Sequence, residues 1–372
     1  MAKILFVANV HQHFLDCHIP YIKWLSEQGH EVHAAAGGNE KIPFVSRQFN
    51  LSIRRTPFSL KNITAYFELK NLLNANNYNL VYCHTPMGGV LARIASRKFR
   101  KKGFLKVLYV AHGFYFYQSA PWFYWVFFFT SEWFLARWTD ALITINQEDY
   151  ENAIKFRFPC KKIYRINGIG MDSDRFKPVT HLQKNRLRNE YGFEYNEFIL
   201  IYAAEFISRK NHRFIINAIP ELLKQIPELK VIFAGTGKLF HKEKEYTNRQ
   251  GLTEKICFMG FRSDIQLLMA MADVGISSSR MEGLPMNVAE EMFCGLPVIA
   301  TNIRGHSDLI TNKNNGMLYP DSDQNTFIEC VTDLYHSKKL RKQLSKNAQE
   351  SVQKFSIHST LIQVSDIFSH YL

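Results

Sequence analysis

The sequence of 372 residues has few cysteines, and their arrangement excludes two common kinds of scaffold. The six cysteines are scattered along the chain, none forms a C-x-x-C pair, and no cysteine and histidine group has zinc-ligand spacing. Disulfide frameworks and structural zinc sites depend on such spacings. The pattern therefore indicates a reducing cytosol and argues against a structural metal.

Long hydrophobic runs and a secretion signal are also missing. The first apolar run, KILFVANV, is too short for a signal-peptide core, and no small-residue cleavage pattern accompanies it. A stretch from Val107 to Ser131 contains no Lys, Arg, Asp or Glu, which raises the question of a membrane span. Polar residues and Pro121 interrupt this stretch, and its remaining run Trp122–Thr130 is too short to cross a bilayer.

Acidic residues are scarce in the first half of the chain. The net charge is +13, and residues 1–171 hold 21 Lys and Arg against 10 Asp and Glu, whereas residues 172–372 hold 25 against 23. The first half therefore carries almost all of the excess positive charge. Such asymmetry predicts a polyanionic partner for the first half, for which phospholipid, lipid phosphate and nucleic acid are the candidates.

Short apolar runs alternate with amphipathic segments of helical length, which predicts βαβ units and parallel sheets. We expect two doubly wound Rossmann-like domains, residues 1–172 and 173–355, joined near INGIGMDSDRFKPV, with a helix at 356–372 packing back on the first domain. Ligands of such sheets bind at the carboxyl ends of the strands, so two facing domains would enclose a cleft. The expected strands are Ile4–Ala8, Val32–Ala36, Leu80–Cys83, Val107–Ala111, Ala141–Ile145, Phe198–Ala204, Val231–Ala234, Ile256–Met259, Val274–Ser277 and Pro297–Thr301.

Residues 281–300, MEGLPMNVAEEMFCGLPVIA, place two acidic residues around a Gly-Leu-Pro turn. We expect a helix at Met286–Phe293, with Glu282 before it and Glu290 within it. Eight helical steps would separate the two by about 12 Å, whereas a glycosidase-type carboxylate pair needs roughly 5–9.5 Å. The spacing therefore favours two separate ligand contacts over an acid/base pair, and a solvent-exposed acidic helix is the alternative.

The start of this helix offers a site for an anion. The N–H groups around Leu284–Asn287 have no partner within the helix, and the positive end of the helix dipole suits a diphosphate.

The region ADVGISSSRMEGLPMNVAEEMFCGLPVIATNIRGHSDLI resembles the E-x7-E signature of retaining GT-B glycosyltransferases of family 4. Six shorter motifs occur in the family's order and extend the resemblance over nearly the whole chain: GHEV, AHGF, NGIGMDSDRF, RKNH, FAGTG and FMGFRSDI. The forms AHGFYFY and RKNH are most similar to members that build capsular polysaccharide or exopolysaccharide.

The resemblance implies a role for each matching residue. Glu282 would contact the donor sugar, Glu290 would bind the ribose, and His112 would lie near the sugar. The diphosphate would be held by Arg209, Lys210 and the helix start Gly283, Leu284, Pro285, Met286 and Asn287. Read without the family, His112 is a structural loop histidine. Phe261 and Arg262 either contact the base or, for Phe261, belong to the core.

Three departures from the family pattern affect these assignments. A Gly-Arg pair common in the family is replaced by Ala204-Glu205, so either Arg209 supplies the missing charge or the diphosphate is bound with fewer cations. The first loop, NVHQHF, lacks the usual glycine pair. Glu291 replaces a common alanine, and we interpret it as a solvated helix position. Gly235 and Gly237 are interpreted as a tight turn.

No cofactor and no metal are expected. Two D-x-D strings, at Asp172/Asp174 and Asp321/Asp323, could chelate a divalent cation on a diphosphate. Both lie in predicted turns, where aspartate commonly bonds to the backbone, and the resemblance implies transfer without a metal.

The segment 114–138 is rich in aromatic residues. Aromatic side chains favour the membrane interface, and a neighbouring basic cluster includes Arg93, Arg97 and Lys101. Together they fit a monotopic protein on an anionic leaflet. A core helix with a solvated basic loop is the alternative.

The functional hypothesis is a cytoplasmic retaining glycosyltransferase, peripheral on the inner face of the cell membrane. It would move a hexosyl or N-acetylhexosaminyl group from a nucleotide sugar, UDP-linked in our hypothesis, to a polyprenyl-diphosphate-linked saccharide in capsule, exopolysaccharide or O-antigen synthesis. The alternatives are a nucleotide-sugar epimerase of the same architecture and a non-catalytic basic protein that binds membrane or nucleic acid. No nucleic-acid partner is expected.

Overall fold

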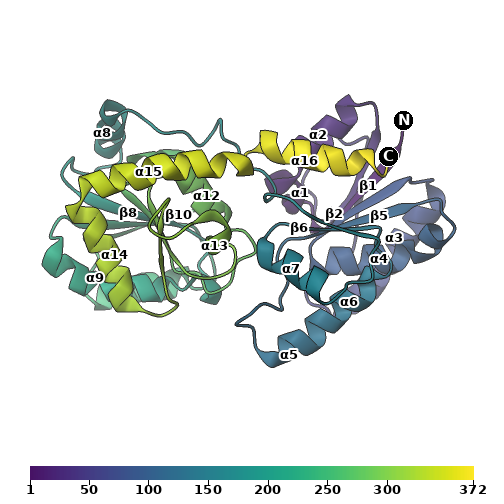
Figure 1. Cartoon of the computed structure of the whole chain (residues 1–372), viewed down its shortest axis with the longest axis horizontal. Helices are drawn as coiled ribbons and strands as arrows, with labels where there is room; N and C mark the ends of the chain where they lie inside the picture. Colours follow the sequence, from purple (N-terminus) through teal and green to yellow (C-terminus); the bar gives the residue numbers. More distant parts are fainter. The chain divides into compact units, whose positions relative to one another are not determined.

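The computed structural model describes residues 1–372 and consists of two compact units (Figure 1). Unit 1 comprises Met1–Gly170 and Ile357–Leu372, and unit 2 comprises Met171–Ser356. Each unit contains one parallel sheet, with seven strands in unit 1 and six strands in unit 2. The predicted class, two parallel α/β domains, is confirmed.

Unit 1 alternates strands and helices along the chain, and its last helix comes from the end of the sequence. Its elements are β1 (Lys3–Val10), α1 (Gln12–Cys17), α2 (Ile19–Glu27), β2 (Glu31–Gly37), β3 (Arg47–Asn50), α3 (Lys61–Ala75), β4 (Leu80–His84), α4 (Pro86–Lys101), β5 (Lys106–Ala111), α5 (Trp122–Tyr124), the π-helix η1 (Trp125–Phe129), α6 (Thr130–Ala136), β6 (Ala141–Thr144), α7 (Gln147–Lys155), β7 (Lys162–Arg165) and α16 (Ile357–Ser369).

Unit 2 repeats this alternation. Its elements are α8 (His181–Glu190), β8 (Phe198–Ala203), the 3-10 turn η2 (Ser208–Lys210), α9 (His212–Gln225), β9 (Leu229–Ala234), α10 (Phe240–Arg249), β10 (Ile256–Gly260), α11 (Ile265–Met271), β11 (Val274–Ser277), α12 (Met286–Phe293), β12 (Val298–Thr301), α13 (His306–Leu309), β13 (Met317–Tyr319), α14 (Gln324–His336), α15 (Lys338–Val352) and the 3-10 turn η3 (Gln353–Phe355).

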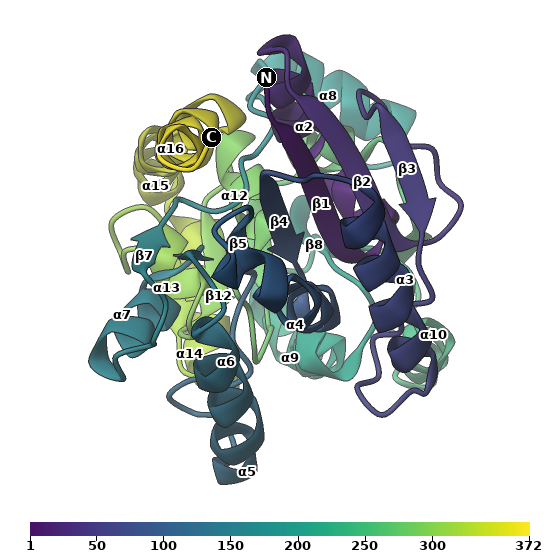
Figure 2. The same ribbon diagram turned by 90° about the vertical axis from the view of Figure 1, so that its right-hand side faces the viewer.

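Both sheets have the strand order of dinucleotide-binding folds. The order is β3-β2-β1-β4-β5-β6-β7 in unit 1 and β10-β9-β8-β11-β12-β13 in unit 2. In each sheet the chain starts in the middle, moves to one edge and then crosses to the other side. Figure 2 shows β3, β2, β1, β4 and β5 of unit 1 in this sequence. The switch points, between β1 and β4 and between β8 and β11, are where open α/β sheets bind ligands.

All ten predicted strands are present, with bounds that differ by a few residues at most. Three strands were not predicted: β3, β7 and β13. Each is an edge strand in its sheet. An edge strand buries less side-chain area than a central one, so β3 (RQFN) and β7 (KIYR) carry no apolar run that a periodicity argument could detect.

The last helix, α16, packs within unit 1 although the 186 residues Met171–Ser356 separate it from the rest of that unit. It lies beside α2, and the rings of Trp24 and Phe368 are 6.2 Å apart. The Tyr21 hydroxyl donates to the Ile169 carbonyl at 2.9 Å and bonds to the Thr360 hydroxyl at 3.0 Å. These buried bonds connect the start, the middle and the end of the sequence.

The aromatic segment has one buried face and one exposed face, so it is not a core helix throughout, and its contact with a membrane stays a prediction. Trp125, Phe128 and Phe129 pack against the core of unit 1. Trp122 and Phe127 are 76% and 66% exposed. The π-helical turn between α5 and α6 lies within this segment, which extends from the body of unit 1 (Figure 2). No helix in the structure combines the length and the apolar character needed to span a bilayer.

The placement of Arg93 in a solvated basic cluster is wrong. Arg93 is 1% exposed, and its guanidinium pairs with Glu132 at 2.8 Å and lies over the ring of Tyr109. It lies on α4, on the face that packs against the sheet, whereas Arg97 lies near the ring of Trp138 and Lys101 is exposed. Each step of four residues turns the side chain by about 40° around the helix axis, so Arg93, Arg97 and Lys101 move in two steps from the sheet face toward solvent.

Candidate donor site at the switch point of unit 2

Two loops meet at the switch point of unit 2, and the first contains Arg209 and Lys210. The turn η2 follows β8, and Asn211 takes a left-handed conformation with φ of 52° before α9 begins. The Tyr202 hydroxyl donates to the Lys210 carbonyl at 2.8 Å, and the Ser278 hydroxyl donates to the same carbonyl at 3.0 Å. The backbone of Lys210 is therefore fixed by side chains from β8 and from the loop after β11.

The second loop contains Glu282, which accepts from both cations. The Lys210 Nζ atom lies 2.5 Å from Glu282 Oε1, and an Arg209 guanidinium nitrogen lies 3.1 Å from Glu282 Oε2. Burial alone would raise the pKa of Glu282, but the charges of Lys210 and Arg209 outweigh it and hold the pKa at about 2. The three predicted residues thus come together as one ionised cluster at neutral pH.

Three residues that sequence reasoning assigned no role complete this cluster. Arg304 donates to the Glu282 carbonyl at 2.9 Å. A side chain on Gly305, whose φ is 84°, would lie 2.9 Å from the Gly283 carbonyl oxygen. His306 is fully buried, its Nε2 atom has no partner, and burial lowers its pKa to about 4. All three lie in the quoted signature region, just after β12. Their position at the carboxyl end of the strand beside β11 is the sequence signal that could have identified them.

The helix after Glu282 is the predicted one, α12, with identical bounds. Pro285 is its N-cap residue, no side chain caps its start, and the buried Asn287 Nδ2 has no hydrogen-bond partner. Gly295, with φ of 79°, follows its end, where the Gly295 and Leu296 N–H groups bond back to Met292 and Glu291 as in a Schellman motif. The start of α12 thus presents backbone and side-chain donors.

Burial raises the pKa of two acidic residues on α12. Burial raises the pKa of Glu290 to about 7, which Arg175 only partly offsets. The interpretation of Glu291 as a solvated position is wrong. It is 0% exposed beside Gly275, neither carboxylate oxygen has a partner, and burial raises its pKa well above the usual value. Glu291 is therefore a neutral side chain in the core, because α12 packs its inner face on β11.

The loops after β9 and β10 lie on the other side of the switch point. Phe261 is 80% exposed, so its alternative interpretation as a core residue is wrong. Arg262 pairs with Asp264 at 2.5 Å. Side chains on Gly235 or Gly237 would lie 2.1 Å and 2.7 Å from backbone atoms of the loop after β8. These two glycines therefore permit a close approach of two loops, as expected of a tight turn.

His112 follows β5 in unit 1 and belongs to a cluster with His13, His18 and His84. Its Nε2 atom lies 3.4 Å from His84 Nδ1, and the Nε2 atoms of His13 and His18 are 3.2 Å apart. Burial lowers the pKa of His13 to about 4 and the pKa of the other three well below the usual value. The sequence shows no such group, because its members come from three separate chain segments.

The D-x-D strings bond to their own backbones. Asp172 accepts from the N–H groups of Asp174 and Arg175, and Asp323 caps α14 by accepting from the Thr326 N–H. Their interpretation as turn residues is confirmed. The expectation of metal-free transfer stays a prediction.

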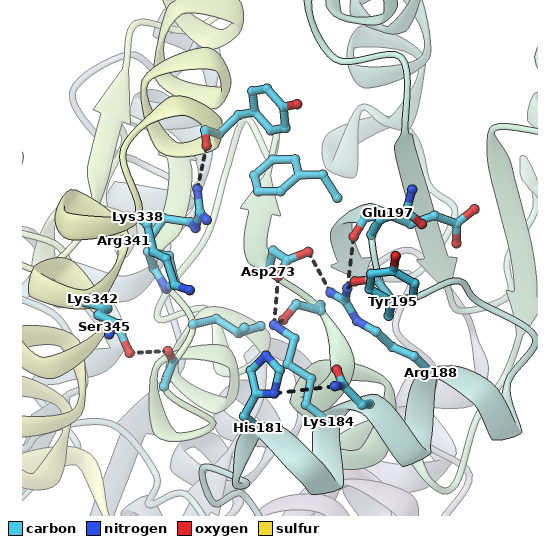
Figure 3. A pocket seen from close by; sticks show the side chains of 18 residues that line it. His181, Lys184, Arg188, Tyr195, Glu197, Asp273, Lys338, Arg341, Lys342 and Ser345 are labelled. Atoms are coloured by element: carbon cyan, nitrogen blue, oxygen red, sulfur yellow. Dashed lines mark hydrogen bonds and ion pairs between the residues drawn. The ribbon is translucent and has the colours of Figure 1, made fainter.

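A pocket of about 390 Å³ in unit 2 lies at the opposite edge of the sheet, beside the amino ends of β8, β11 and β12 (Figure 3). Asp273 at its centre accepts from Lys184 at 2.8 Å and from Arg188 at 2.7 Å. None of the predicted site residues lines it. Since open α/β sheets bind ligands at their carboxyl ends, this pocket is not part of the candidate donor site.

The architecture defines the class of protein first: two parallel α/β units, each with the dinucleotide-binding strand order, as in the GT-B glycosyltransferases. Comparison with known proteins then defines the family. The family described as "Glycosyltransferase Family 4" matches residues 21–169, and "Glycosyl transferases group 1" matches residues 183–351. The two matches together span most of the chain, which belongs to the family 4 glycosyltransferases.

Two curated relatives support the assignment. The chain is 42% identical over 370 residues to "Putative glycosyltransferase EpsD" of Bacillus subtilis (strain 168), covering 100% of this chain and 97% of the relative. It is 27% identical over 314 residues to the Escherichia coli enzyme named UDP-Gal:alpha-D-GlcNAc-diphosphoundecaprenol alpha-1,3-galactosyltransferase, covering 83% and 80% of the two chains.

Solved structures show the same fold. Anabaena Alr3699/HepE in complex with UDP matches 99% of this chain and 100% of its own, with a TM-score of 0.80 and 20% identity. The same protein with UDP-glucose gives a TM-score of 0.80 at 19% identity, with both chains covered completely. WaaG, a glycosyltransferase involved in lipopolysaccharide biosynthesis, matches with a TM-score of 0.77 at 16% identity, covering 98% and 99%.

Proposed function

We propose that this glycosyltransferase is a retaining enzyme that moves a sugar from a UDP-sugar to a polyprenyl-diphosphate-linked saccharide. The observation that carries the proposal is the ionised cluster of Lys210, Arg209 and Glu282 at the switch point of unit 2, beside the uncapped start of α12. The named ligands of the similar proteins, UDP, UDP-glucose and UDP-Gal, support a UDP-linked donor. The acceptor of the Escherichia coli relative supports a lipid-diphosphate acceptor.

The proposed roles follow from charge and position. Lys210 and Arg209, with the α12 start at Gly283–Asn287, hold the diphosphate and offset the negative charge that grows as the bond between the sugar and the diphosphate breaks. Glu282 contacts the donor sugar, and His112 lies near it. Glu290 accepts from the ribose hydroxyls, and Phe261 and Arg262 contact the base. No metal takes part in these roles.

The experiment that tests the reaction measures UDP release. The purified chain is incubated with a panel of UDP-sugars and a bacterial membrane lipid extract, with the extract omitted in a control. UDP release that depends on both components supports glycosyl transfer. Conversion of the donor without the extract would indicate an epimerase instead, and no turnover with any nucleotide sugar would contradict the enzymatic role.

The raised pKa of Glu290 predicts a pH-dependent affinity for uridine. If the ionised carboxylate accepts the ribose hydroxyls, the binding-competent fraction rises from about a tenth at pH 6 to about nine tenths at pH 8, because the pKa is about 7. Uridine affinity should therefore increase up to about tenfold between these values. Uridine is used because, unlike UDP, it carries no phosphate that titrates in this range.

Isothermal titration calorimetry at pH 6, 7 and 8 measures this dependence. The variant Glu290→Gln should bind uridine weakly and with the same affinity at all three values. A wild-type affinity that does not change with pH would contradict the ribose role of the carboxylate.

We further propose that unit 1 associates with the inner face of the cell membrane through α5–α6 and the neighbouring basic end of α4. Trp122, Phe127 and Phe134 are exposed on this segment, and Arg137 lies 4.0 Å from the ring of Phe134. Exposed aromatic side chains beside cations are typical of proteins that lie on anionic membrane surfaces. This location would bring the enzyme to a lipid-linked acceptor.

Replacing Trp122 and Phe127 together by serine should reduce binding to vesicles of anionic phospholipid by at least about tenfold, because each side chain would lose apolar area buried in the membrane. Co-sedimentation with vesicles measures the change. The variant Leu182→Ser is the matched control, since Leu182 is 65% exposed but lies on α8 in unit 2. Equal binding by all three proteins would contradict the proposed surface.

A further inference from the structure

The four-histidine cluster of unit 1 lies at a position where this fold binds ligands. His13 and His18 follow β1, His84 ends β4, and His112 follows β5. The strands β1, β4 and β5 are neighbours in the sheet, and the switch point of unit 1 lies between β1 and β4. The cluster thus occupies in unit 1 the place that Lys210 and Glu282 occupy in unit 2.

The protein itself leaves ring nitrogens of the cluster without partners. His18 Nδ1 and His84 Nε2 are buried and have no hydrogen bond. Both side chains are fully buried or nearly so, at 1% and 0% exposure. Buried polar atoms in native proteins are normally satisfied by protein, water or an ion. The nitrogens that face the other histidines are the remaining ones, His18 Nε2 and His84 Nδ1, so each of these two buried rings has a partner on one side only.

The distances within the cluster are those of an imidazole metal site. Each histidine offers one ring nitrogen, and these four atoms all lie within 4.8 Å of one another. Four nitrogens at about 2.0–2.1 Å from a tetrahedral zinc ion are about 3.3 Å apart. The contacts of His13 with His18 and of His84 with His112, at 3.2 Å and 3.4 Å, already have this length.

The positions of the rings lead to the same conclusion. Four imidazoles on one tetrahedral ion have centroids about 5 Å apart. Five of the six pairs lie between 4.8 Å and 5.8 Å. The sixth pair, His18 and His84, lies at 3.9 Å and would have to open on binding.

We propose that His13, His18, His84 and His112 bind a divalent transition-metal ion of the zinc class. Neutral imidazoles are preferred ligands of zinc, copper and nickel, whereas magnesium and calcium prefer oxygen. The site is distinct from the donor diphosphate site, which lies in unit 2. Its occupancy is independent of the proposed sugar transfer, although an ion here would fix the ring of His112.

Metal binding by the untagged full chain tests the proposal, because a histidine tag would itself bind the ion. The protein is stripped with a chelator, dialysed against zinc chloride and then against metal-free buffer. Mass spectrometry of the bound metal should give about one zinc per chain, and the melting temperature should rise on zinc addition, since a ligand that binds only the folded state stabilises it. Cobalt in place of zinc should produce the visible absorption of a tetrahedral site.

Two variants each remove one proposed ligand, a half-buried histidine in one and a fully buried histidine in the other, and a third variant is the control. His13→Gln and His84→Gln should each lower zinc affinity by about a hundredfold or more, which exceeds the loss from removing an outer hydrogen bond to a ligand. His33→Gln should retain one zinc, since His33 is equally buried in unit 1 but bonds to Tyr78 and Glu31. Circular dichroism establishes that each variant is folded.

Two results would overturn the proposal. One is a wild-type protein that retains no stoichiometric zinc and shows no shift of its melting temperature. The other is zinc binding that persists unchanged in folded His13→Gln and His84→Gln. Either result can occur while UDP release from the donor continues, so failure of the metal site is distinguishable from failure of the proposed reaction.

Discussion

Replacing Glu282 by alanine should reduce kcat by about 10²–10³, the usual effect of removing one group that stabilises a transition state, while UDP affinity is retained. In the structure Glu282 forms ion pairs with both cations of the proposed diphosphate site, at 2.5 Å from Lys210 and 3.1 Å from Arg209. Its removal frees these cations for the nucleotide, so UDP binding should stay equal or become tighter. The loss should therefore appear in kcat and not in the dissociation constant of UDP.

Two further variants establish the cause of this loss. Removing one partner of a buried ion pair is destabilising, so Glu282→Gln, which keeps the volume of the side chain, should show the same loss of kcat in a folded protein. Glu243→Gln is the control, because Glu243 is a buried glutamate of unit 2 that pairs with Arg213 at 2.6 Å, whereas Arg209 and Lys210 pair with Glu282. Retention of more than a tenth of wild-type kcat in both Glu282 variants would exclude the sugar-contacting role.

Replacing Lys210 by alanine should weaken UDP binding by about 10–100-fold, the effect of losing one charge-assisted hydrogen bond, and should change uridine binding little. Lys210 is 8% exposed, and its ammonium group pairs with Glu282. Two hydrogen bonds to the Lys210 carbonyl fix its backbone. A cation held in this way contributes to diphosphate binding and not to recognition of the nucleoside. Calorimetry with UDP and with uridine separates the two contributions.

Lys184→Ala is the matched control for this measurement. Lys184 is also a partly buried lysine of unit 2 in contact with a carboxylate, but it lies at the opposite edge of the sheet, beside Asp273 (Figure 3). It should leave UDP affinity unchanged. Equal losses of UDP and uridine affinity in Lys210→Ala would reject the diphosphate role.

Much of the fold could be read from the sequence because local patterns specify it. Central strands of parallel sheets are buried on both faces, so they appear as short apolar runs, and all nine of these were found together with the edge strand β10. The helix Met286–Phe293 was predicted with its observed bounds, because proline before it and glycine after it are strong local signals. The edge strands β3 and β7 lacked an apolar run, and β13 is apolar but only three residues long.

The donor site was predicted only in part. Glu282 and Lys210 were chosen from their motifs, and the structure places them in contact although 72 residues separate them. Arg304 and His306 were not chosen, since nothing local distinguishes a residue that supports Glu282 from an ordinary loop residue. The prediction for Glu291 was wrong, because helical spacing alone does not tell how much of the surface of a short helix is covered by its neighbours.

The sequence by itself determined the alternation of strands and helices, the family and the two glutamates of the signature, because these depend on residue type and spacing along the chain. Only the tertiary structure decided which charges meet, which carboxyls are neutral and which histidines gather. Those properties depend on the crossing of the chain at the two switch points, which brings the carboxyl ends of distant strands together. His13 meets His112 for this reason, whereas Arg93 pairs with Glu132 because α4 and α6 pack against each other.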